Sequence, residues 1–245
     1  MPNYVKNCLT IVGDEQEIKD CIKYCESSER KFDFEKIIPI PEELQVKESI
    51  RGNVAIKFYL TTLNERRATE VHNLLKITST TSPVGNLGDE VMLTTLDVDE
   101  VKANPRLASE YINLAKQLLN NCATYGYPTW YEWCIDKWGT KWNAFEPSLS
   151  FSENQCKVEF KTAWYSPAPI IEALSQKYPN VMFSLCYADE DIGINCGYFM
   201  YDNGELQTFR EYAGKEAVFF ACNIWGADSA EYLDDSNDDI DEYIE

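Results

Sequence analysis

The hydrophobic pattern at the start of the chain predicts a strand followed by an amphipathic helix. Residues 7–12 form a short apolar run that ends at Gly13. Asp14 is a good helix cap, and Glu17 follows three residues later, as in a capping box. Apolar residues then recur at i, i+3, i+4 and i+7, the spacing of one buried helical face: Ile18, Cys21, Ile22 and Cys25.

The middle of the chain is predicted to be mostly helical, from about residue 42 to residue 121. Apolar residues follow a helical period in residues 56–75 and again in residues 105–119. Residues 78–89 lie between these stretches and are rich in Ser, Thr and Gly, so we expect a long loop there.

The second half of the chain has the pattern of strands. Residues 149–152 and 156–164 flank a short polar turn, which predicts a hairpin. In the second run Val158, Phe160 and Thr162 alternate with charged residues, so this strand is expected to be half-buried.

A helix, a further strand and a second hairpin are predicted next. Pro167 is placed to open a helix with one apolar face: Ile170, Ile171 and Leu174. Residues 181–187 have the composition of a strand. Asp202-Asn203-Gly204 is a strong hairpin signal between residues 197–201 and 206–212.

The predicted order is β-α-β-β-α-β followed by extra strands, once the middle region is set aside. This order is typical of an α+β fold, the ferredoxin-like split βαβ sandwich with an antiparallel sheet. We therefore expect one ferredoxin-like domain over residues 1–227, with a large helical insertion at about 42–147. Residues 228–245 are expected to be a separate acidic C-terminal tail.

Charge is the most unusual bulk property of the chain. Its 41 acidic residues against 22 basic ones give a net charge of −19, and residues 228–245 hold nine acids and no Lys or Arg. Such a charge repels nucleic acid phosphates and attracts basic surfaces. Binding to nucleic acid is therefore disfavoured, and a protein with a basic surface is the expected partner.

Composition also excludes several classes of protein. No run approaches the ~20 apolar residues that a membrane span needs, and the N-terminus does not resemble a signal peptide, so a cytoplasmic protein without membrane contact is expected. The nine cysteines include no C-x-x-C pair and His72 is the only histidine, which argues against a disulfide framework and a zinc site. No phosphate-binding glycine motif occurs. We expect no metal, no cofactor and no catalytic residues.

Three stretches resemble a known family: residues 131–144 (YEWCIDKWGTKWNA), 32–41 (FDFEKIIPIP) and 160–167 (FKTAWYSP). They are similar to the Api/YubB-like family of bacteriophage and plasmid proteins, and the likeness runs to about Trp225. The resemblance implies a ferredoxin-like domain encoded on mobile elements. The family has no established activity, so the resemblance implies no catalytic residues.

The Trp-rich segment has two interpretations. Trp130, Cys134 and Trp138 fall at i, i+4 and i+8, one stripe of a helix, which favours a place in the core. Alternatively, aromatic rings interleaved with lysines stack on bases and contact phosphates. The candidate groove of this second interpretation is lined by Trp138, Lys141 and Trp142.

The acidic tail also has two interpretations. A block of like charges is usually a disordered, solvated segment. Apolar residues among the acids nevertheless provide anchors for a partner, as in an interaction surface. The candidate contacts are Tyr232, Asp234, Asp235, Asp238, Asp239, Asp241, Glu242 and Tyr243.

Three further motifs are weak candidates for a site. His72 has no nucleophile or acid partner at a catalytic spacing, so a surface or half-buried position is expected. The G-x-x-G of residues 85–88 is followed by two acids, which favours a turn over a phosphate clamp. The acidic triplet of residues 189–191 is expected to be solvated and not to bind a metal.

These patterns lead to two hypotheses of function. The first is a non-enzymatic accessory protein of a phage or plasmid that binds a basic surface of a host protein, one that handles DNA or belongs to a defence system. The alternative is a single-stranded nucleic acid or nucleotide-binding module that uses the Trp/Lys-rich segment.

Overall fold

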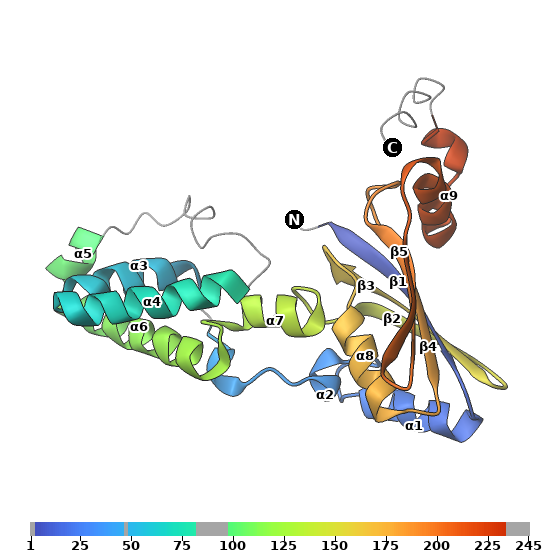
Figure 1. Cartoon of the computed structure of the whole chain (residues 1–245), viewed down its shortest axis with the longest axis horizontal. Coiled ribbons are helices and arrows are strands. Elements are labelled where there is room, and N and C mark those ends of the chain that lie inside the picture. Colours follow the sequence, from blue (N-terminus) through green and yellow to red (C-terminus); the bar gives the residue numbers. More distant parts are fainter. Residues whose placement is uncertain (1–2, 47–48, 82–97, 234–245) are drawn as a thin grey trace. The chain divides into compact units, whose positions relative to one another are not determined.

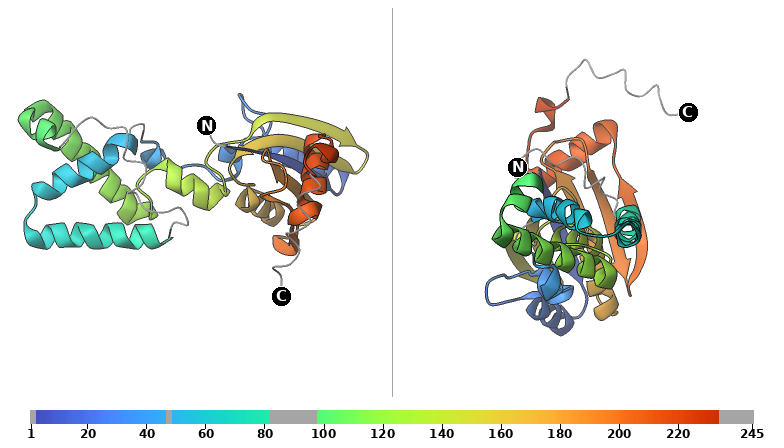
Figure 2. Two further views of the ribbon diagram at one scale, coloured as in Figure 1. Left: turned by 90° about the horizontal axis from the view of Figure 1, so that it is seen from above. Right: turned by 90° about the vertical axis from the view of Figure 1, so that its left-hand side faces the viewer.

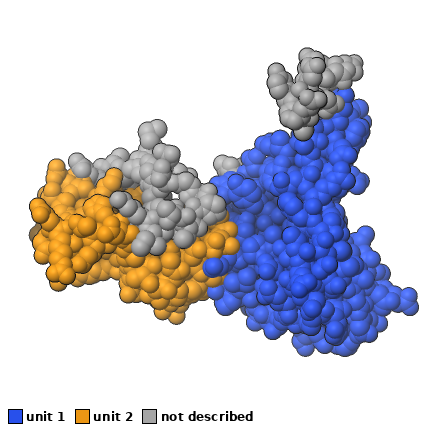
Figure 3. Space-filling view, in the orientation of Figure 1, with its two compact units in different colours: residues 1–39, 137–245 blue, residues 40–136 orange. Residues whose placement is uncertain are grey.

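The computed structural model describes residues 3–46, 49–81 and 98–233. The chain divides into two compact units (Figure 3). The first combines Met1–Pro39 with Lys137–Glu245, and the second is Ile40–Asp136. The second unit overlaps the range of about 42–147 expected for the helical insertion.

The first unit is an antiparallel sheet with helices on both faces. Its first five elements are β1 (Tyr4–Val12), α1 (Glu15–Cys25), α2 (Phe34–Ile37), β2 (Phe145–Ser152) and β3 (Gln155–Ala163). The later ones are α8 (Ala168–Lys177), β4 (Met182–Asp189), β5 (Cys196–Asp202), β6 (Glu205–Glu211), α9 (Gly214–Trp225) and the 3-10 helix η2 (Ser229–Glu231).

The strand order in the described sheet is β2-β3-β1-β4-β5-β6. The first four strands have the order of a ferredoxin-like sheet, β2-β3-β1-β4. In this order the first strands of the two βαβ halves, β1 and β3, lie side by side at the centre. The β5–β6 hairpin extends this sheet beyond β4. The predicted fold class is therefore found, and both predicted hairpins are present.

Alternation along the strands separates the two faces of the sheet. On β3 the buried residues Val158, Phe160 and Thr162 alternate with more exposed charged residues, as predicted. Helices α1 and α8 cover the buried face, and α9 packs on the opposite one (Figures 1 and 2). The contact of α9 is made with Ala188 of β4 and Cys196 of β5.

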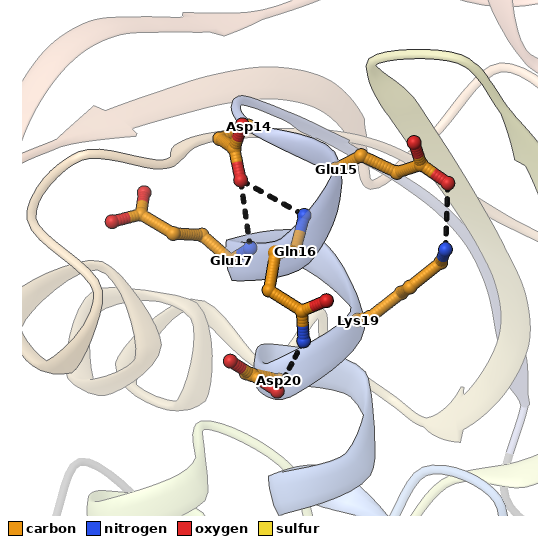
Figure 4. A network of polar contacts seen from close by, with 6 residues as sticks. All are labelled: Asp14, Glu15, Gln16, Glu17, Lys19 and Asp20. Carbon is orange, nitrogen blue, oxygen red and sulfur yellow. Dashed lines mark hydrogen bonds and ion pairs between the residues drawn. The ribbon is translucent and has the colours of Figure 1, made fainter.

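Helix α1 begins where the sequence predicts (Figure 4). The Asp14 carboxylate accepts hydrogen bonds from the backbone N–H groups of Gln16 at 2.9 Å and Glu17 at 3.4 Å. The predicted capping box is only half formed, because the Glu17 carboxylate instead accepts from Asn180 Nδ2 at 3.0 Å. The predicted apolar face is buried: Ile18, Cys21, Ile22 and Cys25.

The second hairpin turns at two residues with positive φ. Asn203 has φ 50° and Gly204 has φ 75°, the combination required by a type I′ turn, whose twist matches that of the flanking strands. The N–H of Gly204 donates to Ser175 Oγ at 2.9 Å, so the turn is also attached to α8.

The second unit is helical. Its elements are η1 (Glu42–Leu44), α3 (Ser49–Thr61), α4 (Glu65–Thr81), α5 (Val98–Ala103), α6 (Pro105–Tyr125) and α7 (Trp130–Trp138), which runs into the first unit at Lys137. Its core is built by α3, α5 and α6 around Phe58, Val101 and Leu118.

Several predicted boundaries were wrong. The periodic stretch of residues 56–75 is two helices, because Asn64 interrupts it and caps α4 by accepting from Arg67 N at 3.0 Å. Residues 78–81, expected in a loop, extend α4, since adding residues to an existing helix needs less intrinsic propensity than starting one. Residues 82–89, the rest of that loop with its G-x-x-G, lie outside the described residues. β2 begins at Phe145, before the expected end of the insertion, and α9 was not predicted at all.

Candidate functional site

Trp138 belongs to the core and does not line a surface groove, which corrects the groove interpretation for this residue. Its side chain is 2% exposed, and its indole N–H donates to the backbone oxygen of Ile38 at 2.8 Å. Its ring meets Phe34 edge to face, with centroids 5.7 Å apart. The helical stripe predicted from Trp130, Cys134 and Trp138 therefore points inward at its C-terminal end, where Cys134 is also fully buried.

The residues after Trp138 pack and hydrogen-bond against other segments of the first unit. Gly139 ends α7 with φ 77°, and a Cβ there would lie 2.8 Å from Pro169 Cδ. The Thr140 hydroxyl donates to the backbone oxygen of Ala163 at 2.8 Å. Asn143 Nδ2 donates to the Asp33 carboxylate at 2.6 Å, and Asn143 Oδ1 accepts from Phe34 N at 2.9 Å. These contacts give the most specific stretch of the family resemblance a structural role.

Lys141 and Trp142 lie at the surface in a group of aromatic residues from three segments of the chain. We call this group the aromatic–lysine cluster; it contains Tyr4, Lys141, Trp142, Phe145 and Trp164. Lys141 Nζ lies 5.0 Å from the ring centroid of Trp142 and 4.7 Å from that of Trp164. The Phe145 ring contacts Trp142 at 6.1 Å and Tyr4 at 5.4 Å, both edge to face. All five side chains are partly exposed.

Backbone strain is concentrated beside this cluster. Trp164 has φ 68°, a left-handed conformation that is rare for a bulky residue. It is held by hydrogen bonds on both sides: its N–H donates to Asn3 O at 3.0 Å, and its oxygen accepts from Asn195 Nδ2 at 2.7 Å. Asn195 and Glu146, which follows Phe145, also have positive φ, at 44° and 52°. With this backbone conformation, the Trp164 indole lies against Lys141, although the two residues belong to different segments.

Acidic side chains offset positive charge near the cluster. Lys161 Nζ lies 2.7 Å from the Glu146 carboxylate, and Lys6 Nζ lies 3.7 Å from that of Glu159. Lys161 and Lys6 are therefore matched by acids, and aromatic surface, more than positive charge, is the distinguishing property of this face.

The other candidate surface is the C-terminal end of the described residues. Tyr232 follows η2 and is 43% exposed, and Phe219 on the outer side of α9 is 53% exposed. Asp228 and Glu231 lie close to the end of α9, where burial, followed by these carboxylates, raises the pKa of the Cys222 thiol. The remaining tail candidates lie outside the described residues: Asp234, Asp235, Asp238, Asp239, Asp241, Glu242 and Tyr243.

The acidic triplet at the end of β4 has a structural role. Asp189 is 4% exposed and accepts hydrogen bonds from Asp191 N and Asn195 Nδ2, both at 3.0 Å. The Glu190 carboxylate accepts from Tyr4 N at 3.0 Å. These side chains hold the start of β1 to the end of β4, so the expectation of a merely solvated triplet was wrong.

No grouping of three or more His, Cys, Asp or Glu side chains suited to a metal ion occurs among the described residues. His72 is exposed on α4, where its Nδ1 lies 2.8 Å from the backbone oxygen of Ala68. Within the same residues, no helix is both long and apolar enough to cross a membrane.

A small cavity of about 280 Å³ opens on the helical unit, lined by residues of both polar and apolar character: Gln45, Val46, Arg51, Glu110, Tyr111, Leu114 and Gln117. Tyr111 is 2% exposed, and its hydroxyl has no hydrogen-bond partner in the described residues. The cavity contains no arrangement of nucleophile and base.

Four members of the candidate surfaces were not found from the sequence: Tyr4, Phe145, Trp164 and Phe219. Trp164 gives no local signal, because its contact with Lys141 depends on the packing of the segment before β2 against the end of β3. Phe219 was missed with α9, although Ala217, Ala221 and Gly226 have the spacing of a helix face and its C-terminal cap.

Comparison with known proteins supports the fold and part of the resemblance. Residues 137–219, about a third of the chain, match a family model described as the ferredoxin-like domain in Api92-like proteins. This match agrees with the observed strand order and confirms the predicted ferredoxin-like α+β fold.

A search of curated proteins finds no match. Among solved structures, the crystal structure of protein Api92 from Yersinia pseudotuberculosis aligns with 87% of this chain and 99% of its own. The identity is 13% and the TM-score is 0.43, values too low to carry a functional argument.

Proposed function

We propose that this chain is a non-enzymatic, cytoplasmic accessory protein of the Api92-like family, encoded by a phage, plasmid or other mobile element. Its role would be to bind a basic surface of a host protein that handles DNA or acts in defence. The match of residues 137–219 supports the family assignment, and the mobile-element origin follows from the sequence resemblance.

Charge segregation is the observation that carries this proposal. Residues 228–245 hold nine acids and no basic residue, and they follow directly on a helix that presents an exposed aromatic ring, Phe219. Interfaces often combine an apolar anchor with surrounding charge, because the anchor supplies desolvation energy while the charges steer association.

The packing of α9 explains why Phe219 is available. Ala217, Ala221 and Cys222 are buried against the sheet, so Phe219 points away from it. Glu216 on the same helix is paired with Arg210 at 2.6 Å. Tyr232, within residues 228–245, provides a second aromatic side chain. We infer that a partner would contact Phe219 and Tyr232 and place basic groups against the acids that follow.

An affinity capture from the natural host tests this proposal, with full-length protein compared with a chain ending at Ala227. We expect a basic host protein to be retained by the full-length chain only, and to be released as salt is raised from about 50 to 500 mM, since the Debye length falls from about 14 Å to about 4 Å over this range.

A matched pair of triple variants separates tail charge from total charge. Asp234→Asn, Asp238→Asn and Glu242→Gln remove three charges from the tail, whereas Glu29→Gln, Glu100→Gln and Glu153→Gln remove three exposed charges elsewhere. Only the first set should weaken binding. Equal weakening by both sets, or binding that is insensitive to salt, would contradict the proposal.

A second candidate function is favoured by the aromatic–lysine cluster. The Trp142 and Trp164 rings, 5.0 and 4.7 Å from the Lys141 ammonium, provide surfaces on which bases can stack next to a positive charge. We propose single-stranded nucleic acid or nucleotide as the ligand of this cluster, with Trp164 in place of the buried Trp138.

Quenching of tryptophan fluorescence by an oligonucleotide tests the second candidate. We expect Trp142→Ala to reduce affinity roughly 5- to 150-fold, because stacking is worth ~1–3 kcal/mol per base. Lys141→Gln should also reduce affinity, because it removes a positive charge beside the phosphates. Trp130→Ala, outside the cluster, is the control. Quenching that survives both cluster variants would exclude this site.

A further inference from the structure

Cys8 and Cys186 stand directly opposite each other on the two central strands of the sheet. The register of β1 with β4 pairs Cys8 with Cys186 in one uninterrupted antiparallel ladder that runs from Val5–Asp189 to Val12–Met182. Directly opposed residues of an antiparallel pair have their side chains on the same face. The two thiols are therefore neighbours, although they lie far apart in the sequence.

Both thiols are on the face of the sheet that faces away from α1 and α8. Cys8 alternates with the buried Asn7 and Leu9, and Cys186 alternates with the buried Leu185 and Tyr187. Both cysteines are partly exposed, while the chain's other seven cysteines are buried. A reagent in solution therefore reaches these two thiols first.

The surroundings of the two thiols determine their protonation state. Burial raises the pKa of the Cys8 thiol to about 11; Glu159 and the Cys186 thiol add to the rise, and Lys6 and Lys157 oppose it. Burial also raises the pKa of Cys186. Both groups are thus neutral thiols near pH 7, and an ion that binds them must displace their protons.

The phase of the ladder determines how far apart the two residues are. Glu190 N donates to Tyr4 O at 2.8 Å, which marks the Tyr4–Glu190 position as hydrogen-bonded. Hydrogen-bonded and non-hydrogen-bonded positions alternate, so Cys8–Cys186, four residues further along β1, is hydrogen-bonded again. At such positions the Cα atoms are about 5.5 Å apart, the wider of the two spacings.

A wide pair favours a bridging atom over a direct disulfide. The Cβ atoms of directly opposed residues are about 4.5–5.5 Å apart, and hydrogen-bonded positions lie at the upper end of this range. A disulfide needs Cβ atoms within about 3.5–4.5 Å, whereas a metal ion with bonds of about 2.3 Å to each sulfur, the length found for zinc, spans a larger gap. Thiolates are soft ligands that select Cu(I), zinc and Fe–S clusters. Zinc sites use three or four protein ligands and Fe–S clusters use four thiolates, so a pair of thiolates suits Cu(I).

We propose that Cys8 and Cys186 form a two-thiolate site for a soft cation, with Cu(I) as the ion. Binding converts Cu(I) and two thiols into a Cu(I) dithiolate and two released protons, with no change of oxidation state. Two sulfur–copper bonds form as two S–H bonds break. Lys6 and Lys157 oppose the negative charge that the complex gains, while Glu159, opposite Cys8 on β3, adds to it. The site is independent of the proposed function.

An anaerobic titration of the full chain with Cu(I), in competition with a coloured Cu(I) chelator, tests the site. We expect one high-affinity ion per chain. Both thiols should then be protected from alkylation by iodoacetamide, as mapped by mass spectrometry of the unsubstituted protein.

Three variants complete the test. Cys8→Ser and Cys186→Ser should each weaken binding at least tenfold. The control is Cys196→Ser, because Cys196 lies on the neighbouring strand opposite Ala188 instead of a cysteine. Binding that survives both cysteine variants, or alkylation of Cys8 and Cys186 that is unchanged by Cu(I), would overturn the proposal. So would a Cys8–Cys186 disulfide that forms readily with oxidised glutathione in a protein that does not bind Cu(I).

Discussion

Asn143 donates its side-chain N–H to the Asp33 carboxylate at 2.6 Å, although 110 residues separate the two in the chain. Asp33 is 8% exposed and also accepts from Glu35 N at 3.0 Å. The same amide accepts from Phe34 N. One side chain thus joins the segment before the helical unit to the segment after it, and this allows the sheet to form around a large insertion.

Replacing Asn143 with Ala should therefore destabilise the first unit. The change leaves the nearly buried Asp33 carboxylate and the Phe34 N–H without this partner, at a cost of about 2–3 kcal/mol. Urea unfolding followed by far-UV circular dichroism measures this free energy. The control is Asn180→Ala, which removes an exposed hydrogen bond to Glu17 and should cost less than about 0.5 kcal/mol. Similar losses in the two variants would show that Asn143 has no special role.

Gly204→Ala is expected to be more harmful than Gly126→Ala. Both glycines have positive φ, at 75° and 84°, so each substitution costs about 1 kcal/mol of backbone strain. A Cβ at Gly204 would in addition lie 2.5 Å from Gln176 Cγ and 3.3 Å from Gln176 Cα, whereas Gly126 has nothing within 4 Å. We expect a total loss of about 2–3 kcal/mol for Gly204→Ala. Equal unfolding midpoints for the two variants would mean that the hairpin moves away from α8 at little cost.

The buried carboxyl group of Glu132 is expected to make the stability of the protein depend on pH. Burial raises its pKa above the ordinary value of 4.5, against the hydrogen bond donated by the Thr129 hydroxyl at 2.7 Å. The folded chain therefore holds this proton to a higher pH than the unfolded chain does. Below the unfolded pKa there is no penalty, and as pH rises through the folded pKa the buried carboxylate becomes charged and stability falls.

Glu132→Gln removes this penalty and keeps an oxygen that accepts from Thr129. We expect the variant to match the parent protein at about pH 4 and to exceed its stability at pH 7. Thermal unfolding at the two pH values measures the difference, and Glu29→Gln, at an exposed position, should show no such change. A variant less stable than the parent at pH 7 would show that the charged carboxylate has stabilising partners.

The Cys8 thiol should react slowly near neutral pH. With its pKa at about 11 instead of 9.0, its thiolate fraction rises about tenfold per pH unit between pH 7 and 10. The rate of alkylation by iodoacetamide in a Cys186→Ser background, followed by peptide mass spectrometry, should rise in proportion. A rate that levels off near pH 9 would indicate that the thiol is less buried than the structure shows.

Local patterns predicted the framework of the fold well. The caps and periodicities of α1 and α8, the alternation on β3 and the Asn203-Gly204 turn depend on residues within a few positions of one another, and sequence displays such relations directly. The strand order followed from them because a split βαβ unit has few ways to close its sheet. Errors occurred where context overrides propensity, as in the extension of α4 through the Thr- and Ser-rich residues 78–81.

The candidate sites were less predictable. The Trp-rich segment was compatible with both core and groove, and only packing assigned Trp138 to the core and Trp142 to the surface. The partner of Lys141 is Trp164, a residue whose left-handed backbone is stabilised by Asn3 and Asn195. Nothing near Trp164 in the sequence marks that conformation.

The sequence by itself determined the order and type of most elements of the sheet unit, the helical character of the insertion and the segregation of acidic residues into the last 18 positions. These properties depend on local spacing and composition. Only the tertiary structure decided that Cys8 opposes Cys186, that Asn143 holds Asp33 and that Trp164 lies beside Lys141. Each of these contacts depends on strand register or on a long-range crossing, where a shift of one residue would place a different side chain, and spacing along the chain does not encode that choice.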